Sequence, residues 1–296
     1  MSRSSRFSGI ALVLASAVLF SAKSVLVKLA YQSHVDAVSL LTLRMVFALP
    51  FFLVMAWLAS RGSRQATLHR RDWLALVLLG VGGYYFASLF DFLGLKYISA
   101  SLERLILFLY PTITVFLSAV FLRKPIRPLT WLAVLVSYAG MATVFLGEPL
   151  GHSEHLLWGS LLVFASALAY ASYLVGSGEI MQRIGANRCT GIVLSIACLC
   201  SLVHFLVANR IDSLLVSPRV YGIGLALAVF CTVLPATLLS NGIRRIGASP
   251  AALIGGVGPV STIYLGYLFL GESITPQQGV GALLVLAGVL IISLNK

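Results

Sequence analysis

The chain has 296 residues, of which 59% are hydrophobic and only 10% are charged, and its formal net charge is +12. An ordinary soluble domain is about 25% charged, so this composition excludes a soluble globular protein and indicates a protein of the lipid bilayer. The basic residues lie between apolar runs, where Lys and Arg set orientation in a membrane, so we discard nucleic-acid binding.

Ten apolar runs meet the length of roughly 17 to 25 residues that a membrane-spanning helix needs. In chain order they cover residues 7–30, 38–59, 73–95, 98–122, 129–146, 156–177, 189–208, 220–240, 249–270 and 276–294. The connections are too short for a folded soluble domain. The first run holds Lys23 and Lys28 and is followed by no small-residue cleavage pattern, so we expect it to stay in the mature protein.

Basic residues gather at alternate ends of these runs. With the N-terminus inside, fourteen Lys and Arg residues fall at cytoplasmic ends, and only Lys96, Arg210 and Arg219 fall at outer ends. Short loops that carry Lys and Arg are retained on the cytoplasmic side. We therefore expect both termini to be cytoplasmic, which agrees with an even number of spans.

The segment 94–124 recurs at 242–272, an offset of 148, and the first run matches the sixth at an offset of 150. Two copies of a five-span unit must enter the membrane from opposite sides, because five is odd. The predicted fold is therefore an all-α integral membrane protein with ten transmembrane helices in two inverted five-helix repeats, at 1–147 and 156–296. Such repeats are typical of secondary transporters, which bind substrate between the copies.

Ionisable residues within the predicted spans all belong to the first repeat and to the outer half of the bilayer: Lys23, Lys28, Arg44, Asp91, Glu103 and Arg104. Each costs at least about 2.5 kcal/mol on insertion, so such groups are candidates for function. We take Lys23, Asp91, Glu103 and Arg104 as substrate-binding or coupling candidates, with structural ion pairs as the alternative. Lys28 and Arg44 lie near enough to the outer interface to snorkel to water.

Polar and aromatic residues follow these charges at helical spacing. Tyr84 and Ser88 share a face with Asp91, and Tyr110 is predicted to share one with Glu103. In a bilayer such faces line a shared interior. The further substrate-contact candidates are Phe20, Tyr84, Ser88, Tyr110, Tyr170 and Tyr173. Helix packing is the alternative for the aromatic residues.

Pro111 and Pro259 fall at matching positions in the middle of their spans. Proline removes a helix donor, and paired interruptions in two repeats point to a transporter's binding region. The predicted helix-break or hinge residues are Pro111, Pro259, Gly255, Gly256 and Gly258.

No enzymatic or metal-binding motif is visible. The four cysteines lack metal-type spacing, and the sequence contains no phosphate loop, HExxH motif or nucleophile elbow. We therefore expect no catalytic residues, no metal and no cofactor, and we leave open a proton as the coupling ion.

Two long segments, YISASLERLILFLYPTITVFLSAVFLRKPI and IGASPAALIGGVGPVSTIYLGYLFLGESITPQQGVGALLVLAGVLII, resemble the EamA type of the drug/metabolite transporter superfamily. The resemblance covers nearly the whole chain. It implies ten helices in inverted repeats, a central cavity lined mainly by helices 1, 3, 4, 6, 8 and 9, and movement of small metabolites across the cytoplasmic membrane. Members often have Trp where this chain has Phe20 and Tyr170, and an acidic residue where it has Lys124.

Our hypothesis from the sequence is an exporter of a small polar or zwitterionic metabolite, such as an amino acid, that works by alternating access. Lys23 and Arg104 would bind a carboxylate, and Asp91 or Glu103 an amine or a coupling proton. The alternatives are a multidrug or organic-cation exporter and, from another class, a receptor or scaffold without transport. The expected partners are the small-molecule substrate and the lipid bilayer, and the oligomeric state stays open.

Overall fold

A computed structural model of the chain describes residues 3–61, 67–123, 128–147, 153–246, 254–255 and 257–294, and these residues contain helices and no strand. Seven helical runs are long and apolar enough to cross a membrane, and the helices Trp131–Val144 and Val257–Leu270 are apolar but shorter. A multi-pass membrane architecture, which composition predicted, is thus confirmed.

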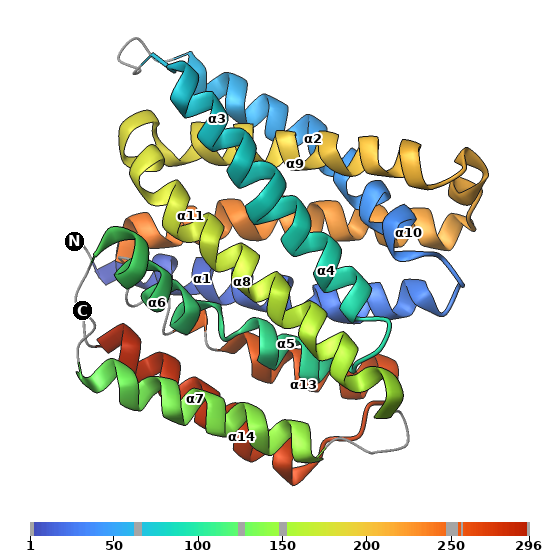
Figure 1. The fold of residues 1–296 in the computed structure, drawn as a ribbon, viewed down its shortest axis with the longest axis vertical. Helices are drawn as coiled ribbons and strands as arrows, with labels where there is room; N and C mark the ends of the chain where they lie inside the picture. The colour runs from blue at the N-terminus through green and yellow to red at the C-terminus, as the bar shows by residue number, and fades with distance from the viewer. Residues whose placement is uncertain are drawn as a thin grey trace.

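The elements follow one another with short connections (Figure 1). In chain order they are α1 (Arg3–Tyr31), α2 (Ala37–Ser60), α3 (Arg70–Leu78), η1 (Leu79–Tyr85), α4 (Phe86–Gly94), α5 (Ala100–Leu107), α6 (Tyr110–Leu122), α7 (Pro128–Gly147), α8 (Ser153–Ile184), α9 (Ala186–Ala208), η3 (Ile211–Leu214), α10 (Pro218–Ala228), η4 (Val229–Val233), α11 (Leu234–Ile246), α13 (Val257–Leu270) and α14 (Pro276–Leu294). Most predicted runs agree with these bounds to within a few residues, but α8 and α11 continue several residues further.

The predicted run at 98–122 is two helices rather than one. α5 ends at Leu107 and α6 begins at Tyr110, with Pro111 in its first turn. The break falls before the proline, because proline is tolerated at a helix start and disrupts a helix interior. It also corrects the prediction that Glu103 and Tyr110 share one unbroken face.

Two spans contain π-helical segments that no sequence pattern predicted. η1 joins α3 to α4 and η4 joins α10 to α11, and the first residues of the two segments, Leu79 and Val229, lie 150 positions apart. A π segment inserts a residue into an α-helix and frequently marks a functional region. Thr232 in η4 donates its hydroxyl to the Leu227 carbonyl at 2.9 Å, which satisfies an acceptor of the widened turn.

The helices pack in pairs that join the early and late parts of the chain. α7 lies along α14, α2 along α9, α1 along α11 and α13, and α8 along α4 and α6 (Figure 1). At one end of the α2–α9 pair, Asp36 accepts hydrogen bonds from the Ser39 amide at 2.9 Å and from Asn209 Nδ2 at 3.2 Å. Partial burial acts to raise the pKa of the Asp36 carboxyl, but these hydrogen bonds outweigh burial and hold that pKa below its usual value.

Two glycines allow close approach at corresponding helix crossings. A Cβ on Gly94 of α4 would lie 2.9 Å from the Gly159 carbonyl oxygen and 2.5 Å from Val163 Cγ2 of α8. A Cβ on Gly242 of α11 would collide with Val13 Cγ2 of α1. Small residues at such crossings are typical of helix packing in membranes, where close van der Waals contact drives association.

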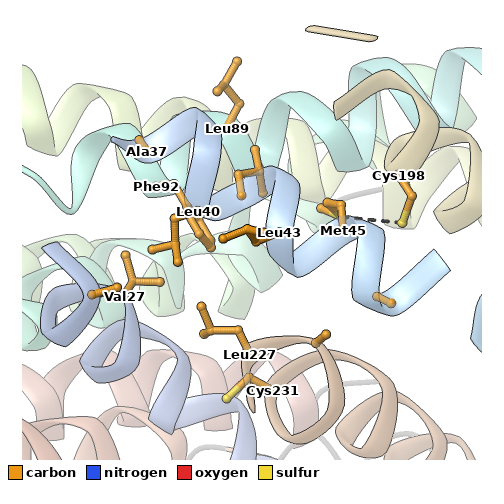
Figure 2. Packing of buried hydrophobic residues seen from close by; sticks show 14 of the residues in the cluster. Val27, Ala37, Leu40, Leu43, Met45, Leu89, Phe92, Cys198, Leu227 and Cys231 are labelled. Atoms are coloured by element: carbon orange, nitrogen blue, oxygen red, sulfur yellow. Dashed lines mark hydrogen bonds between the residues drawn. The ribbon is translucent and has the colours of Figure 1, made fainter. Parts of the chain in front are cut away.

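The largest hydrophobic cluster lies among α1, α2, α4, α9 and α10 (Figure 2). Leu40, Met45 and Phe92 are fully buried within it. The outer surface is also apolar, with residues such as Leu74, Val120 and Val207 more than 60% exposed. An apolar exterior around polar internal groups is the arrangement expected of a protein dissolved in lipid.

We predict that Gly94→Ala and Gly242→Ala each lower the free energy of unfolding by about 1 to 3 kcal/mol, because the added methyl group overpacks a helix crossing. Thermal unfolding of the purified protein in detergent would measure the effect. Gly222→Ala on α10 is the control, since no atom lies within 4 Å of a Cβ added there. It should be neutral or slightly stabilising, and equal losses in all three variants would refute the packing explanation.

Candidate functional site

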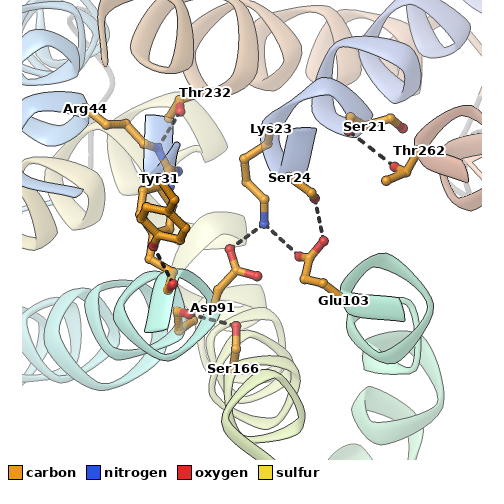
Figure 3. A network of polar contacts seen from close by, with 12 residues as sticks. Ser21, Lys23, Ser24, Tyr31, Arg44, Asp91, Glu103, Ser166, Thr232 and Thr262 are labelled. Atoms are coloured by element: carbon orange, nitrogen blue, oxygen red, sulfur yellow. Dashed lines mark hydrogen bonds and ion pairs between the residues drawn. The ribbon is translucent and has the colours of Figure 1, made fainter. Parts of the chain in front are cut away.

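A buried ion-pair cluster joins three helices of the first half of the chain (Figure 3). Lys23 Nζ on α1 donates to Asp91 Oδ2 on α4 at 2.5 Å and to Glu103 Oε1 on α5 at 3.1 Å. Lys23 is 7% exposed, Asp91 3% and Glu103 0%. Ser24, the residue after Lys23, donates its hydroxyl to Glu103 Oε2. The cluster is therefore closed off from solvent.

Local structure explains why these three side chains meet. Ser99 caps α5 by accepting a hydrogen bond from the Leu102 amide at 3.1 Å, which fixes the first turn where Glu103 lies. Asp91 projects from the last turns of α4 toward α1. The opposite charges then converge on Lys23. A buried charge without a partner would cost several kcal/mol, so this convergence is what makes the charges tolerable in the fold.

Arg104 lies next to this cluster but is not paired with it. Its Nε is buried and has no hydrogen-bond partner among the residues that the structure describes. Its guanidinium instead lies against α13, where a Cβ on Gly258 would be 2.9 Å from Nη2. Within the same described part of the chain, Asp91 Oδ1 is a buried acceptor without a partner. One anionic and one cationic side chain thus each keep an unused hydrogen-bonding atom.

Four of the predicted tyrosines form a continuous row beside these charges. The ring centroids of Tyr84 and Tyr173 are 6.0 Å apart, those of Tyr173 and Tyr170 5.9 Å, and those of Tyr170 and Tyr110 5.2 Å. Edge-to-face and stacked contacts at these separations are favourable. Tyr110 begins α6, the helix that directly follows the one carrying Arg104. The row thus leads toward the unpaired arginine.

Arg44 does not extend to the membrane surface as we expected. It is 4% exposed, donates its Nε–H to Thr232 Oγ1 at 2.9 Å, and lies over the Phe92 ring at 5.4 Å from the centroid. It has no carboxylate partner within the described part of the chain. Thr232 belongs to η4, the π segment between α10 and α11. Arg44, in the first half of the chain, therefore binds a π segment of the second half.

We predict a coupling free energy of about 1 to 3 kcal/mol between Arg44 and Thr232 in a double-mutant cycle with Arg44→Met and Thr232→Val. The single changes should each destabilise the protein, because each leaves the other polar group buried without its partner. Thermal unfolding of the four proteins gives the coupling. Arg61→Met in place of Arg44→Met is the control, because Arg61 is exposed at the end of α2 and should show no coupling to Thr232. Additive effects of Arg44→Met and Thr232→Val would contradict the prediction.

The remaining predicted residues occupy varied positions. Phe20 is half-buried on α1, and Ser88 is 8% exposed on α4 between Tyr84 and Asp91. Pro111 is the second residue of α6 and Pro259 the third residue of α13, so both prolines lie in the first turn of a helix. The mobility of these hinge candidates stays a prediction.

Of the predicted hinge glycines, Gly258 takes part in hydrogen bonds and Gly255 has open space around it. The Gly258 carbonyl accepts from Ser21 at 2.9 Å and from Thr262 at 3.2 Å. Among the described residues, no side chain or neighbouring helix lies within 4 Å of a Cβ added to Gly255. Gly256 lies outside the residues that the structure describes.

Sequence reasoning missed several residues that build the site. Ser21 and Ser24 surround Lys23 on α1, and Thr232 receives Arg44. Their small hydroxyl groups are common in membrane helices, so composition alone does not single them out. The one available signal was position, since Ser21 and Ser24 flank Lys23 within a single helical turn.

An apolar exterior, a set of long spanning helices and a buried cluster of complementary charges together define a multi-pass membrane protein with a polar interior. The comparisons agree. Residues 7–146 and 157–294 each match the EamA-like transporter family. The chain belongs to this family, which confirms the resemblance seen in its two glycine- and proline-containing segments.

Known relatives carry transporter names. A Bacillus subtilis (strain 168) protein described as "Uncharacterized transporter YcbK" is 30% identical over 92% of this chain and 88% of its own. A Salmonella typhimurium protein described as "Uncharacterized inner membrane transporter YicL" is 28% identical over 96% of this chain and 94% of its own. A solved crystal structure shares the fold with a TM-score of 0.65 at 21% identity, covering 99% of this chain and 98% of that one.

Proposed function

We propose that the protein is a secondary transporter that exports a small zwitterionic metabolite, such as an amino acid, across the cytoplasmic membrane by alternating access. The observation that carries this proposal is the pair of unused buried atoms, Asp91 Oδ1 and Arg104 Nε. The first is an acceptor for an ammonium group and the second a donor to a carboxylate. An amino acid carries both groups on one small molecule.

The tyrosine row supports the same substrate class. Tyr110 and Tyr170 lie near Arg104, so they would contact the part of the substrate that adjoins its carboxylate. Aromatic rings offer an apolar body with a polar hydroxyl, which suits a ligand that is charged at one end and apolar at the other. Tyr84 and Tyr173 would then set the size of the substrate's apolar group.

We assign ten spans in two inverted repeats, 1–147 and 156–296, with both termini cytoplasmic. Three observations support this. The family matches twice, at 7–146 and 157–294. Contacts between the halves come in matching pairs, because α1 packs on α11 and α8 packs on α4. In the first pair Ser16 donates to the Pro235 carbonyl at 2.8 Å, and in the second Ser166 donates to the Ala87 carbonyl at 2.7 Å. α1 and α14 have their chain ends on one side of the molecule (Figure 1).

The coupling ion in this proposal is a proton held by the Lys23, Asp91 and Glu103 cluster. One lysine faces two carboxylates, so a single proton can be added without leaving a positive charge unpaired. Groups of this kind in membrane spans commonly form proton relays. Loss or gain of that proton would change the charge that the substrate ammonium meets at Asp91.

A multidrug or organic-cation exporter has less support, because a cation would use Asp91 Oδ1 but leave the buried Arg104 Nε, a donor suited to a carboxylate, without a partner. A receptor or scaffold has less support as well, because the relatives with matching length carry transporter names. Counterflow of any solute in liposomes separates transport from the last alternative.

The test is uptake of labelled amino acids into liposomes that contain the purified protein, preceded by a thermal-stability screen of metabolites, since a bound ligand raises apparent stability. We expect counterflow of a zwitterionic amino acid by the wild-type protein. Lys23→Ala and Glu103→Gln should remove both the uptake and its pH dependence. Wild-type uptake and pH dependence in both variants would overturn the site assignment.

A further inference from the structure

Glu272 lies immediately after α13 in a turn that aims its side chain back across the molecule. Gly271 ends the helix with φ at 68°, in the left-handed region that favours glycine. The Glu272 amide then donates to the Gly266 carbonyl at 3.3 Å. Gly266 also leaves room for the side chain, because a Cβ there would lie 2.9 Å from Glu272 Oε2.

The Glu272 carboxylate binds the first turn of α5. Oε1 accepts from the Ala100 amide at 2.8 Å, and Oε2 accepts from the Ser101 amide at 3.3 Å and from the Ser101 hydroxyl at 2.8 Å. Ser99 satisfies the next amide, that of Leu102. The first N–H groups of a helix have no partner within the helix. The helix dipole is positive at this end, so it favours a carboxylate there.

This contact joins the second half of the chain to the helix that carries Glu103 and Arg104. The cluster of Lys23, Asp91 and Glu103 lies within the first half and cannot by itself hold the halves together. Glu272 can, because its carboxylate and α5 come from opposite halves. Ala100 and Ser101 are 0% and 1% exposed and Glu272 is half-buried, so the contact is formed and partly shielded from solvent in this conformation.

We infer that Glu272, Ala100 and Ser101 form an outer latch, in which Glu272 positions α5 and keeps the outer ends of the two halves together. The inference rests on the proposed function for its membrane orientation and for the movement of the halves. Opening at the outer end withdraws the carboxylate from three donors. Glu272 acts through α5 and is a positioning residue rather than a substrate ligand.

The experiment reads the outer end directly and needs no substrate. Ile98→Cys, introduced after replacing the four native cysteines, places a thiol beside α5 where Ile98 is 3% exposed. A membrane-impermeant maleimide added from outside labels this thiol only when the outer end opens. Glu272→Gln should raise the labelling rate about tenfold, because an amide cannot replace both acceptor oxygens. Asp212→Asn, on the same predicted side in η3, should leave the rate unchanged.

A second variant separates the latch from simple capping of α5. Ser99→Asp retains an N-cap residue and adds a negative charge at the helix start. Combined with Glu272→Gln, it should restore the melting temperature but leave the labelling fast. An unchanged rate in Glu272→Gln, or a wild-type rate in the double variant, would overturn the latch. If Glu272→Gln does not fold, Glu272→Asp should show a smaller increase. If Glu272→Gln is labelled fast but the wild-type protein shows no counterflow, the proposed function is refuted and the latch is not.

Discussion

Lys23→Met is expected to lower the free energy of unfolding by about 3 to 5 kcal/mol and to abolish transport, because it leaves two buried carboxylates without their cation. Asp91 and Glu103 both contact the Lys23 ammonium and are 3% and 0% exposed. The lost attraction cannot be replaced by water at that depth. Thermal unfolding in detergent and uptake into liposomes would measure the two effects separately.

A neutralised cluster distinguishes folding from function. The triple variant Lys23→Met, Asp91→Asn, Glu103→Gln should recover most of the stability, since it leaves no uncompensated charge buried in the cluster. It should still fail to transport. Lys96→Met is the control, because Lys96 is exposed and such surface charges contribute about 0 to 1 kcal/mol. A stable and active Lys23→Met protein would contradict this account.

Arg104→Gln is expected to raise the substrate KM at least about 30-fold, because a lost charged contact to substrate is worth roughly 2 to 5 kcal/mol. The change in stability should stay below about 1 kcal/mol. The folded protein loses little, since Arg104 Nε has no partner in the described residues. Arg104→Lys keeps the charge but loses the planar fork that suits a carboxylate, so its KM should be intermediate. Concentration-dependent uptake gives each KM.

Gly258→Ala tests the same site from α13. The added Cβ would meet Arg104 Nη2 at 2.9 Å, so the guanidinium must shift and the KM should rise. Gly255→Ala is the matched control on open space. Equal KM values for wild-type, Arg104→Gln and Gly258→Ala proteins would show that the substrate binds elsewhere. An amino-acid amide lacks the carboxylate, so it should compete poorly with the substrate for the wild-type protein. This discrimination should be seen in the wild-type protein and not in the variants.

Much of the architecture was accessible from the sequence because lipid imposes simple rules. Apolar runs of spanning length gave the helices, and the cost of burying charge directed attention to Lys23, Asp91 and Glu103. The structure brings these three together. Helical periodicity also grouped Tyr170 with Tyr173 on α8, where their ring centroids are 5.9 Å apart. Their contact with substrate stays a prediction.

Other features depend on contacts that periodicity does not encode. The π segments η1 and η4 have no local sequence signature, and the break between α5 and α6 precedes Pro111 instead of centring on it. Arg44 could reach either water or a neighbouring helix from its depth, and only packing decides that it binds Thr232. Glu272 is one of several acidic residues in the loops of the sequence, and only the fold brings its carboxylate to the first turn of α5.

The fixed charges of the interior have an electrical consequence. Four cations, Lys23, Lys28, Arg44 and Arg104, face two carboxylates, Asp91 and Glu103, in the predicted outer half of the spans, which leaves two positive charges in excess. A charge that moves through the membrane field changes in energy by about 2.3 kcal/mol per 100 mV. A zwitterionic substrate carries no net charge, so its binding leaves this excess in place, and the voltage across the membrane should act alike on the empty and the loaded carrier.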